Sequence, residues 1–107
     1  MTRTMPPRLE IDREAIADFC RRRHITEMSL FGSVLRDDFR SDSDVDVLVT
    51  FAREDRSTLF DLVHMQEELT VIFGRSVDLV SRTAVEKSEN WIRRRAILEG
   101  AERIYAA

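Results

Sequence analysis

The chain is poor in the residues that mark secreted or membrane proteins. It has one cysteine, Cys20, so no disulfide can form within it. A reducing, cytoplasmic compartment fits that composition. Residues 1–10 lack the apolar run of a signal peptide, and no apolar stretch approaches the roughly 18 residues of a membrane-spanning helix. We therefore expect a cytoplasmic protein without a membrane segment.

Excess positive charge is also missing. The formal net charge is −3 at pH 7, which gives no overall attraction to phosphate backbones. Arginines cluster at residues 21–23 and 93–95, but aromatic residues do not alternate with them as they do in many single-strand binders. We expect these clusters to be solvated helix faces, or otherwise a docking surface for an acidic partner. Direct nucleic-acid binding is not expected.

Length and periodicity predict one small domain over residues 1–107, with residues 1–10, which contain Pro6 and Pro7, as a flexible arm. Helices are predicted over residues 12–22, 34–38, 58–73 and from 86 or 88 to about 99. Strands are predicted over residues 27–31, 44–51, 77–81 and 103–106, the last at a sheet edge. The expected fold class is α/β (α+β), a small mixed sheet with flanking helices.

Side-chain patterns support the helix assignments. Asp12 and Ser57 are the expected N-caps, and Gly74 is a suitable C-terminal stop for the long helix. The expected buried stripe of that helix is Leu62, Met65, Leu69 and Ile72. The expected apolar side of the last helix is Ile92, Ala96 and Ile97.

A glycine–serine turn separates the first strand from the short predicted helix. Gly32 allows close backbone approach and unusual dihedral angles, and the Ser33 hydroxyl is a side-chain donor. A strand–glycine–helix junction leaves free N–H groups at the helix start, where the helix dipole also favours an anion. The turn is therefore a predicted phosphate-binding site.

Two aspartates follow on alternate positions of the next strand. Side chains alternate along a strand, so Val45, Val47 and Val49 form one face, whereas Asp44 and Asp46 lie on the other. Two like charges beside a core are costly unless a cation lies between them. Mg²⁺, which prefers hard oxygen ligands, is the expected ion.

A third carboxylate, Asp78, lies in the strand predicted at 77–81. If that strand pairs with the 44–51 strand, Asp78 joins the same face. Three carboxylates suit a two-metal site, in which the third also draws a proton from a nucleophile. A Ca²⁺ loop at Asp42, Asp44 and Asp46 is disfavoured because the glycine and distal glutamate of that loop are missing.

The pattern Gly32-Ser33, ten residues, Asp44-Val45-Asp46, with Asp78 in a later strand, resembles the minimal nucleotidyltransferases of the DNA polymerase β superfamily. The resemblance covers residues 28–81. Size and element order are also similar to those of MNT-domain antitoxins that pair with HEPN toxins. The resemblance implies the polymerase β-like nucleotidyltransferase fold.

The resemblance also implies residue roles. Gly32 and Ser33 would bind the β and γ phosphates of ATP, and Asp44, Asp46 and Asp78 would ligate two Mg²⁺ ions, with Asp78 as the base. Arg36 stands where relatives often have an arginine near the phosphates, although Asp37 follows it where many of them have glycine. Ser43 matches the serine that precedes the first metal-binding aspartate.

The implied function is transfer of AMP from ATP to a hydroxyl, expected to be tyrosine, of a partner HEPN ribonuclease toxin. Larger nucleotidyltransferases carry a second, acceptor-binding domain, for which this chain has no room, so the acceptor is expected on another molecule. One alternative is a non-catalytic antitoxin that neutralises its partner by stoichiometric contact. Another is a nucleotidyltransferase that acts on RNA or a small molecule within a complex.

Overall fold

The computed structural model describes residues 11–32, 44–53 and 57–107. The helices are α1 Arg13–Arg22, α2 Leu59–Phe73, α3 Arg82–Glu86 and α4 Trp91–Gly100. The strands are β1 Ile25–Phe31, β2 Val45–Phe51, β3 Val77–Ser81 and β4 Glu102–Ala106. The helix predicted at 34–38 lies outside the described residues. Within the described part, no helix is both long enough and apolar enough to cross a bilayer.

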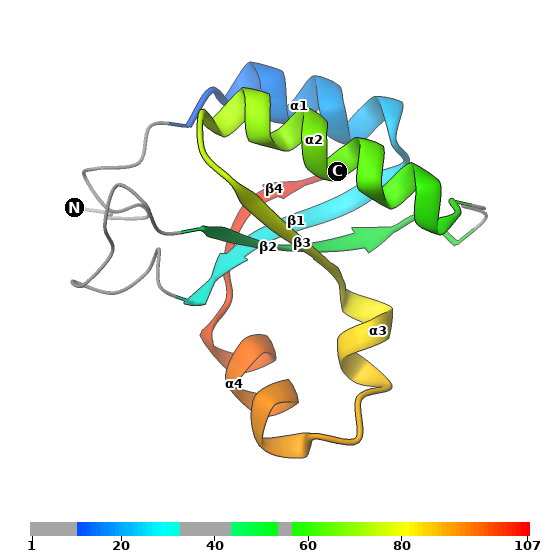
Figure 1. The fold of residues 1–107 in the computed structure, drawn as a ribbon, viewed down its shortest axis with the longest axis vertical. Helices are drawn as coiled ribbons and strands as arrows, with labels where there is room; N and C mark the ends of the chain where they lie inside the picture. The colour runs from blue at the N-terminus through cyan, green and yellow to red at the C-terminus, as the bar shows by residue number, and fades with distance from the viewer. Residues whose placement is uncertain (1–10, 33–43, 54–56) are drawn as a thin grey trace.

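The strands form a four-stranded mixed sheet in the order β3-β2-β1-β4. β1 runs antiparallel to both β2 and β4, and β2 runs parallel to β3. Helices α1 and α2 cover one face of the sheet, and α3 and α4 lie on the other (Figure 1). This arrangement confirms the predicted fold class, including β4 at a sheet edge.

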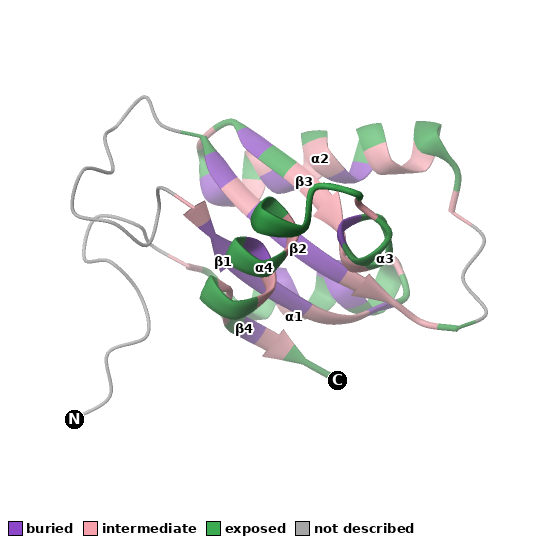
Figure 2. Ribbon diagram, turned by 90° about the horizontal axis from the view of Figure 1, so that it is seen from below, coloured by how far each residue is buried: buried purple, intermediate pink, exposed green. Residues whose placement is uncertain are grey.

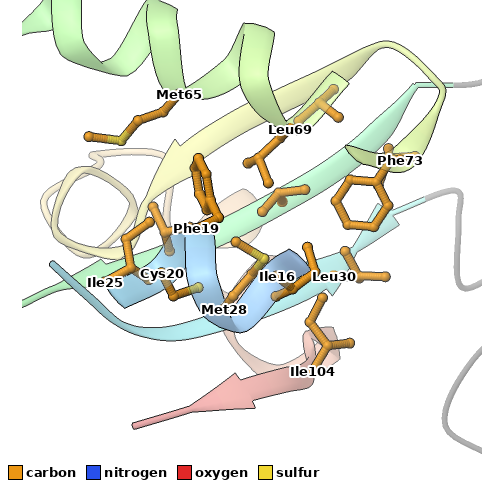
Figure 3. Close-up of a cluster of buried hydrophobic side chains, with 14 residues drawn as sticks. Ile16, Phe19, Cys20, Ile25, Met28, Leu30, Met65, Leu69, Phe73 and Ile104 are labelled. Atoms are coloured by element: carbon orange, nitrogen blue, oxygen red, sulfur yellow. The ribbon is translucent and has the colours of Figure 1, made fainter. Parts of the chain in front are cut away.

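The main core lies between the sheet and α1 and α2 (Figure 3). Phe19, Met65 and Leu69 from the helices are essentially inaccessible to solvent, as are Val45, Val47 and Val49 of β2. The alternation along β2 therefore places its valines in the core, as predicted. Cys20 lies in the same cluster, and burial raises the pKa of its thiol to about 12, which makes it a packing residue rather than a nucleophile.

A smaller cluster occupies the opposite face, where α3 and α4 lie against the sheet (Figure 2). It joins Phe31 of β1 and Leu48 of β2 to Val85 of α3 and Ile97 of α4. Val80 of β3 packs against this cluster. This face is therefore apolar where α3 and α4 cover it.

Local capping explains where the first helices begin and end. The Asp12 side chain accepts a hydrogen bond from the N–H of Ala15, so the predicted cap is confirmed. The predicted cap Ser57 is wrong by one residue, because Thr58 caps α2 and forms a reciprocal capping box with Asp61. Gly74 ends α2 in the left-handed conformation, as predicted.

Four further expectations are corrected. Residues 82–86 form the separate helix α3, which is capped by Ser81, and α4 begins only at Trp91, after the cap Asn90. Of the three predicted apolar residues of α4, only Ile97 is buried, whereas Ile92 and Ala96 are exposed. In α2 the buried residues are Met65, Leu69 and Phe73, with Leu62 and Ile72 only half-buried. β1 begins two residues earlier than predicted, at Ile25.

A charged contact joins α1 to α2. Glu68 of α2 accepts hydrogen bonds from the guanidinium groups of Arg22 and Arg23, the latter at 3.1 Å. The hydrogen bond from Arg22, supported by Arg23, lowers the pKa of Glu68 although burial opposes the shift. A carboxyl with a lowered folded pKa stabilises the protein above its unfolded pKa, and that stabilisation disappears as the pH falls through the folded pKa.

We expect Glu68→Gln to lower the free energy of unfolding by about 1 kcal/mol at pH 7, since a partly exposed charged network contributes little more than that. The difference from wild type should begin to shrink as the pH falls below the ordinary glutamate pKa of about 4.3, and it should disappear as the pH falls through the lowered pKa of Glu68 in the folded protein. Urea unfolding at several pH values measures both effects. A difference that stays constant down to pH 3 would contradict the assignment.

Candidate functional site

Two of the predicted site residues are direct neighbours in the sheet. In the parallel pairing of β2 with β3, Asp46 lies opposite Asp78, and Leu48 lies opposite Val80. Paired positions project from the same face, and neighbouring strands are about 4.8 Å apart. Leu48 and Val80 belong to the small cluster beneath α3 and α4. The two carboxylates therefore share that face, at the end of the sheet where β2 and β3 begin.

Gly32 closes the site from the side of β1. It follows Phe31, which pairs with Asp46 in the antiparallel register, and its φ is +76°. A Cβ atom placed on Gly32 would lie 2.2 Å from Oδ2 of Asp46. A side chain at this position would therefore displace the carboxylate. Gly32 was predicted to allow close approach of a phosphate, and its lack of a side chain also leaves space for the Asp46 carboxylate.

The carboxylates differ in exposure. Asp46 is half-buried, whereas Asp78 and Asp44, which immediately precedes β2, are exposed. Within residues 11–32, 44–53 and 57–107, no three acidic, histidine or cysteine side chains gather closely enough to hold a metal ion. Asp46 and Asp78 nevertheless fit Mg²⁺, which binds through one or two protein carboxylates and takes its remaining ligands from phosphates and water.

The other predicted site residues cannot be placed. Ser33, Arg36 and Ser43 lie outside the described residues, so their roles stay predictions. The metal-binding role of Asp44, Asp46 and Asp78 also stays a prediction, although the pairing of the 77–81 strand with β2, on which Asp78 depended, is now observed.

Gln66 of α2 is a residue to which the sequence analysis gave no role. Its side-chain oxygen accepts a hydrogen bond of 3.0 Å from the N–H of Leu79, the residue after Asp78. Gln66 is half-buried and directly follows Met65, which is fully buried in the main core. The sequence signal was a glutamine next to a predicted buried position of the helix, Met65. That signal does not tell which strand the glutamine bonds.

A cavity of about 240 Å³ lies elsewhere, beside the start of β1 and the end of β2. Cys20, Ile25, Ala52 and Tyr105 are among its lining residues. Because Asp46 pairs with the last residue of β1, Phe31, this cavity is at the opposite end of the sheet from the carboxylates. It is therefore separate from the candidate site.

Comparisons with known proteins identify the family of the chain. Residues 13–104 match the nucleotidyltransferase domain family. The chain is 36% identical over 62 residues to the protein adenylyltransferase MntA of Thermococcus cleftensis, a match that covers 58% of this chain and 61% of that relative. The matched segment thus spans less than two thirds of the relative's length.

Solved structures share the fold. A protein described as a minimal nucleotidyltransferase superimposes with a TM-score of 0.63 at 34% identity, covering 83% of this chain and 85% of that one. A complex of the tri-AMPylated Shewanella oneidensis HEPN toxin with its MNT antitoxin contains a chain that superimposes with a TM-score of 0.60 at 18% identity, covering 89% of this chain and 70% of the other.

The fold agrees with the matched family, and the resemblance inferred from the motif is confirmed. The chain belongs to the nucleotidyltransferase domain family, and within it the chain is similar to minimal nucleotidyltransferases.

Proposed function

We propose that this protein is an antitoxin-type adenylyltransferase that transfers AMP from ATP to a hydroxyl, that of a tyrosine, on a partner HEPN toxin. The observation that carries the proposal is the register of β2 and β3, which brings Asp46 opposite Asp78 beside Gly32. The substrate class is supported by the relatives, one of which is named a protein adenylyltransferase and another of which is bound to an AMPylated HEPN toxin.

In this reaction the acceptor oxygen attacks the α-phosphorus of ATP, and the bond from that phosphorus to the β-phosphate bridging oxygen breaks. Pyrophosphate leaves, and the hydroxyl proton passes to Asp78, the exposed carboxylate of the pair. The Gly32–Ser33 turn would bind the β and γ phosphates, and Arg36 and Ser43 keep the nucleotide-binding roles that the family resemblance implies. The chain would contribute mainly positioning and electrostatics.

Asp44, Asp46 and Asp78 would hold two Mg²⁺ ions. When bound, the ions supply Lewis-acid stabilisation of charge on the phosphate oxygens. Asp46 is the best held of the three residues, because it lies within β2 with a strand on either side. The exposure of Asp44 and Asp78 leaves room for phosphate and water ligands.

A second candidate function, neutralisation of the partner by contact alone, is favoured by exposed apolar side chains. The exposed large apolar residues on α2 and α4 are Leu59, Phe60, Val63, Val71, Trp91 and Ile92. Side chains of this kind suit a protein partner when they lie near one another on the surface. Contact and catalysis are compatible, so the experiment must separate them.

The test is incubation of the chain with Mg²⁺, ATP labelled at the α-phosphate and the protein encoded by the adjacent gene. Intact mass and label on that protein measure transfer, and toxicity in cells measures neutralisation. Asp46→Asn is the inactive variant. A mass gain of about one AMP per event, lost in the variant together with neutralisation, is the expected result; an unlabelled partner that is still neutralised by Asp46→Asn would favour contact alone.

A further inference from the structure

The strand that carries Asp78 is the last strand at one side of the sheet. Among the strands of the described residues, β3 pairs with β2 alone, in parallel over five residues. Alternate backbone groups of an edge strand point away from its neighbour and have no partner in the sheet. The N–H of Leu79 is such a group, since it bonds to a side chain of α2 and not to β2. Asp78 therefore lies on a strand that is paired along one side, by β2.

Gln66 of α2 bonds the unpaired side of β3. Its side-chain oxygen is 3.0 Å from the nitrogen of Leu79, one residue beyond Asp78. The backbone of α2 at this point is fixed, because Met65 and Leu69 on either side are fully buried in the main core. The hydrogen bond thus ties the outer edge of β3 to α2, which packs against β3 and covers one face of the sheet together with α1 (Figure 1).

We propose that Gln66 is a positioning residue. By bonding the N–H of Leu79, it holds β3 in the register that places Asp78 opposite Asp46. The inference rests on the proposed function in so far as Asp78 is a metal ligand. Outer partners that orient metal-binding carboxylates typically affect metal affinity or activity by roughly 10–100-fold. Gln66 acts through β3 and is not a catalytic residue, because it bonds the strand backbone from α2. Helix α2 covers the face of the sheet opposite to α3 and α4 (Figure 1), whereas Asp78 lies on the face of α3 and α4.

The experiment compares four variants of the ¹⁵N-labelled full chain. Gln66→Met has a similar side-chain length and helix propensity but lacks the strong acceptor. Gln66→Asn, which keeps the amide but is too short to reach, is the second loss variant in case the first does not fold. Gln66→Glu restores an acceptor oxygen. Thr58→Ala is the matched control, since it destabilises the same helix at its cap without touching β3.

The readouts are amide hydrogen exchange of Leu79 and the broadening by Mn²⁺ of the Asp46 and Asp78 amide signals. We expect Gln66→Met and Gln66→Asn to speed Leu79 exchange at least tenfold relative to the other β2 and β3 amides, and to weaken Mn²⁺ binding by about tenfold. Gln66→Glu should recover most of both. Thr58→Ala should lower the melting temperature but leave Mn²⁺ binding unchanged.

Two outcomes would overturn the inference. In the first, the exchange rate of the Leu79 amide does not change in the Gln66 loss variants. In the second, Leu79 exchanges faster but Mn²⁺ binding and AMP transfer both stay at wild-type levels, which would mean that Gln66 only protects the edge of β3. Failure of the proposed function looks different. In that case the wild-type chain labels no partner with AMP, whereas the loss variants still weaken Mn²⁺ binding at Asp78, and the positioning role stands.

Discussion

Asp46→Asn is expected to reduce AMP transfer on the order of a thousandfold, as the loss of a group that acts on the charge of the transition state does. Asparagine has nearly the same size, and Asp46 lies between two paired strands, so the fold should persist. The substitution removes one negative charge from the sheet face that Asp46 shares with its paired residue, Asp78. Of the three carboxylates that would hold Mg²⁺, only Asp44 and Asp78 would then remain.

The rate should be measured under single-turnover conditions with labelled ATP and the partner protein. Asp18→Asn is the matched control, because it makes the same chemical change on an exposed position of α1, where Asp18 pairs with Arg22. Asp78→Asn should also reduce the rate, and the double variant should lose far less than the product of the two effects, since both residues act as one unit. Independent, multiplicative losses would contradict a shared site.

The strands that carry Asp46 and Asp78 could be predicted from the sequence. Whether the two strands pair with each other could not be predicted. The alternation of valines with Asp46 in β2 and the short apolar run around Asp78 each mark a strand through local pattern. Register and direction depend on contacts between segments that are separated by the whole of α2. The parallel alignment of Asp46 with Asp78 therefore came from the structure.

Helix faces were predicted less well for a physical reason. α2 carries apolar side chains on both its buried and its exposed sides, including Phe60 and Val71, which are 80% and 82% exposed. Periodicity identifies a buried face only where the opposite face is polar. The same ambiguity affected α4, where Ile92 was expected to be buried and is 66% exposed. Apolar residues in excess of what the core accepts are also those that favour a protein partner.

The N-cap of α2 could be predicted from the sequence, but only by considering Thr58 together with Asp61. Ser57 and Thr58 are both good caps in isolation, and the choice depends on Asp61, whose side chain accepts from the Thr58 N–H at 2.8 Å. The same hydrogen bond, with that of the Thr58 hydroxyl, lowers the pKa of Asp61. The reciprocal spacing from 58 to 61 was present in the sequence and would have identified Thr58.

Gly32→Ala is expected to reduce transfer about a hundredfold, because a displacement of about 1 Å at a reacting centre can cost that much. The added Cβ would lie 2.2 Å from Oδ2 of Asp46, so the carboxylate must move or the turn must open. The φ of +76° also strains any residue with a side chain, which should cost about 1 kcal/mol or more of stability. Two effects, one on stability and one on the site, are thus predicted for one substitution.

Gly74→Ala separates the two effects. Gly74 has nearly the same φ, +70°, but a Cβ placed on it meets nothing within 4 Å. Both variants should therefore lose comparable melting temperature, about 5 °C for a domain of this size, whereas only Gly32→Ala should lose activity at a temperature where both are fully folded. Equal activity of the two variants would mean that Gly32 serves the turn alone, and that the Asp46 carboxylate tolerates displacement.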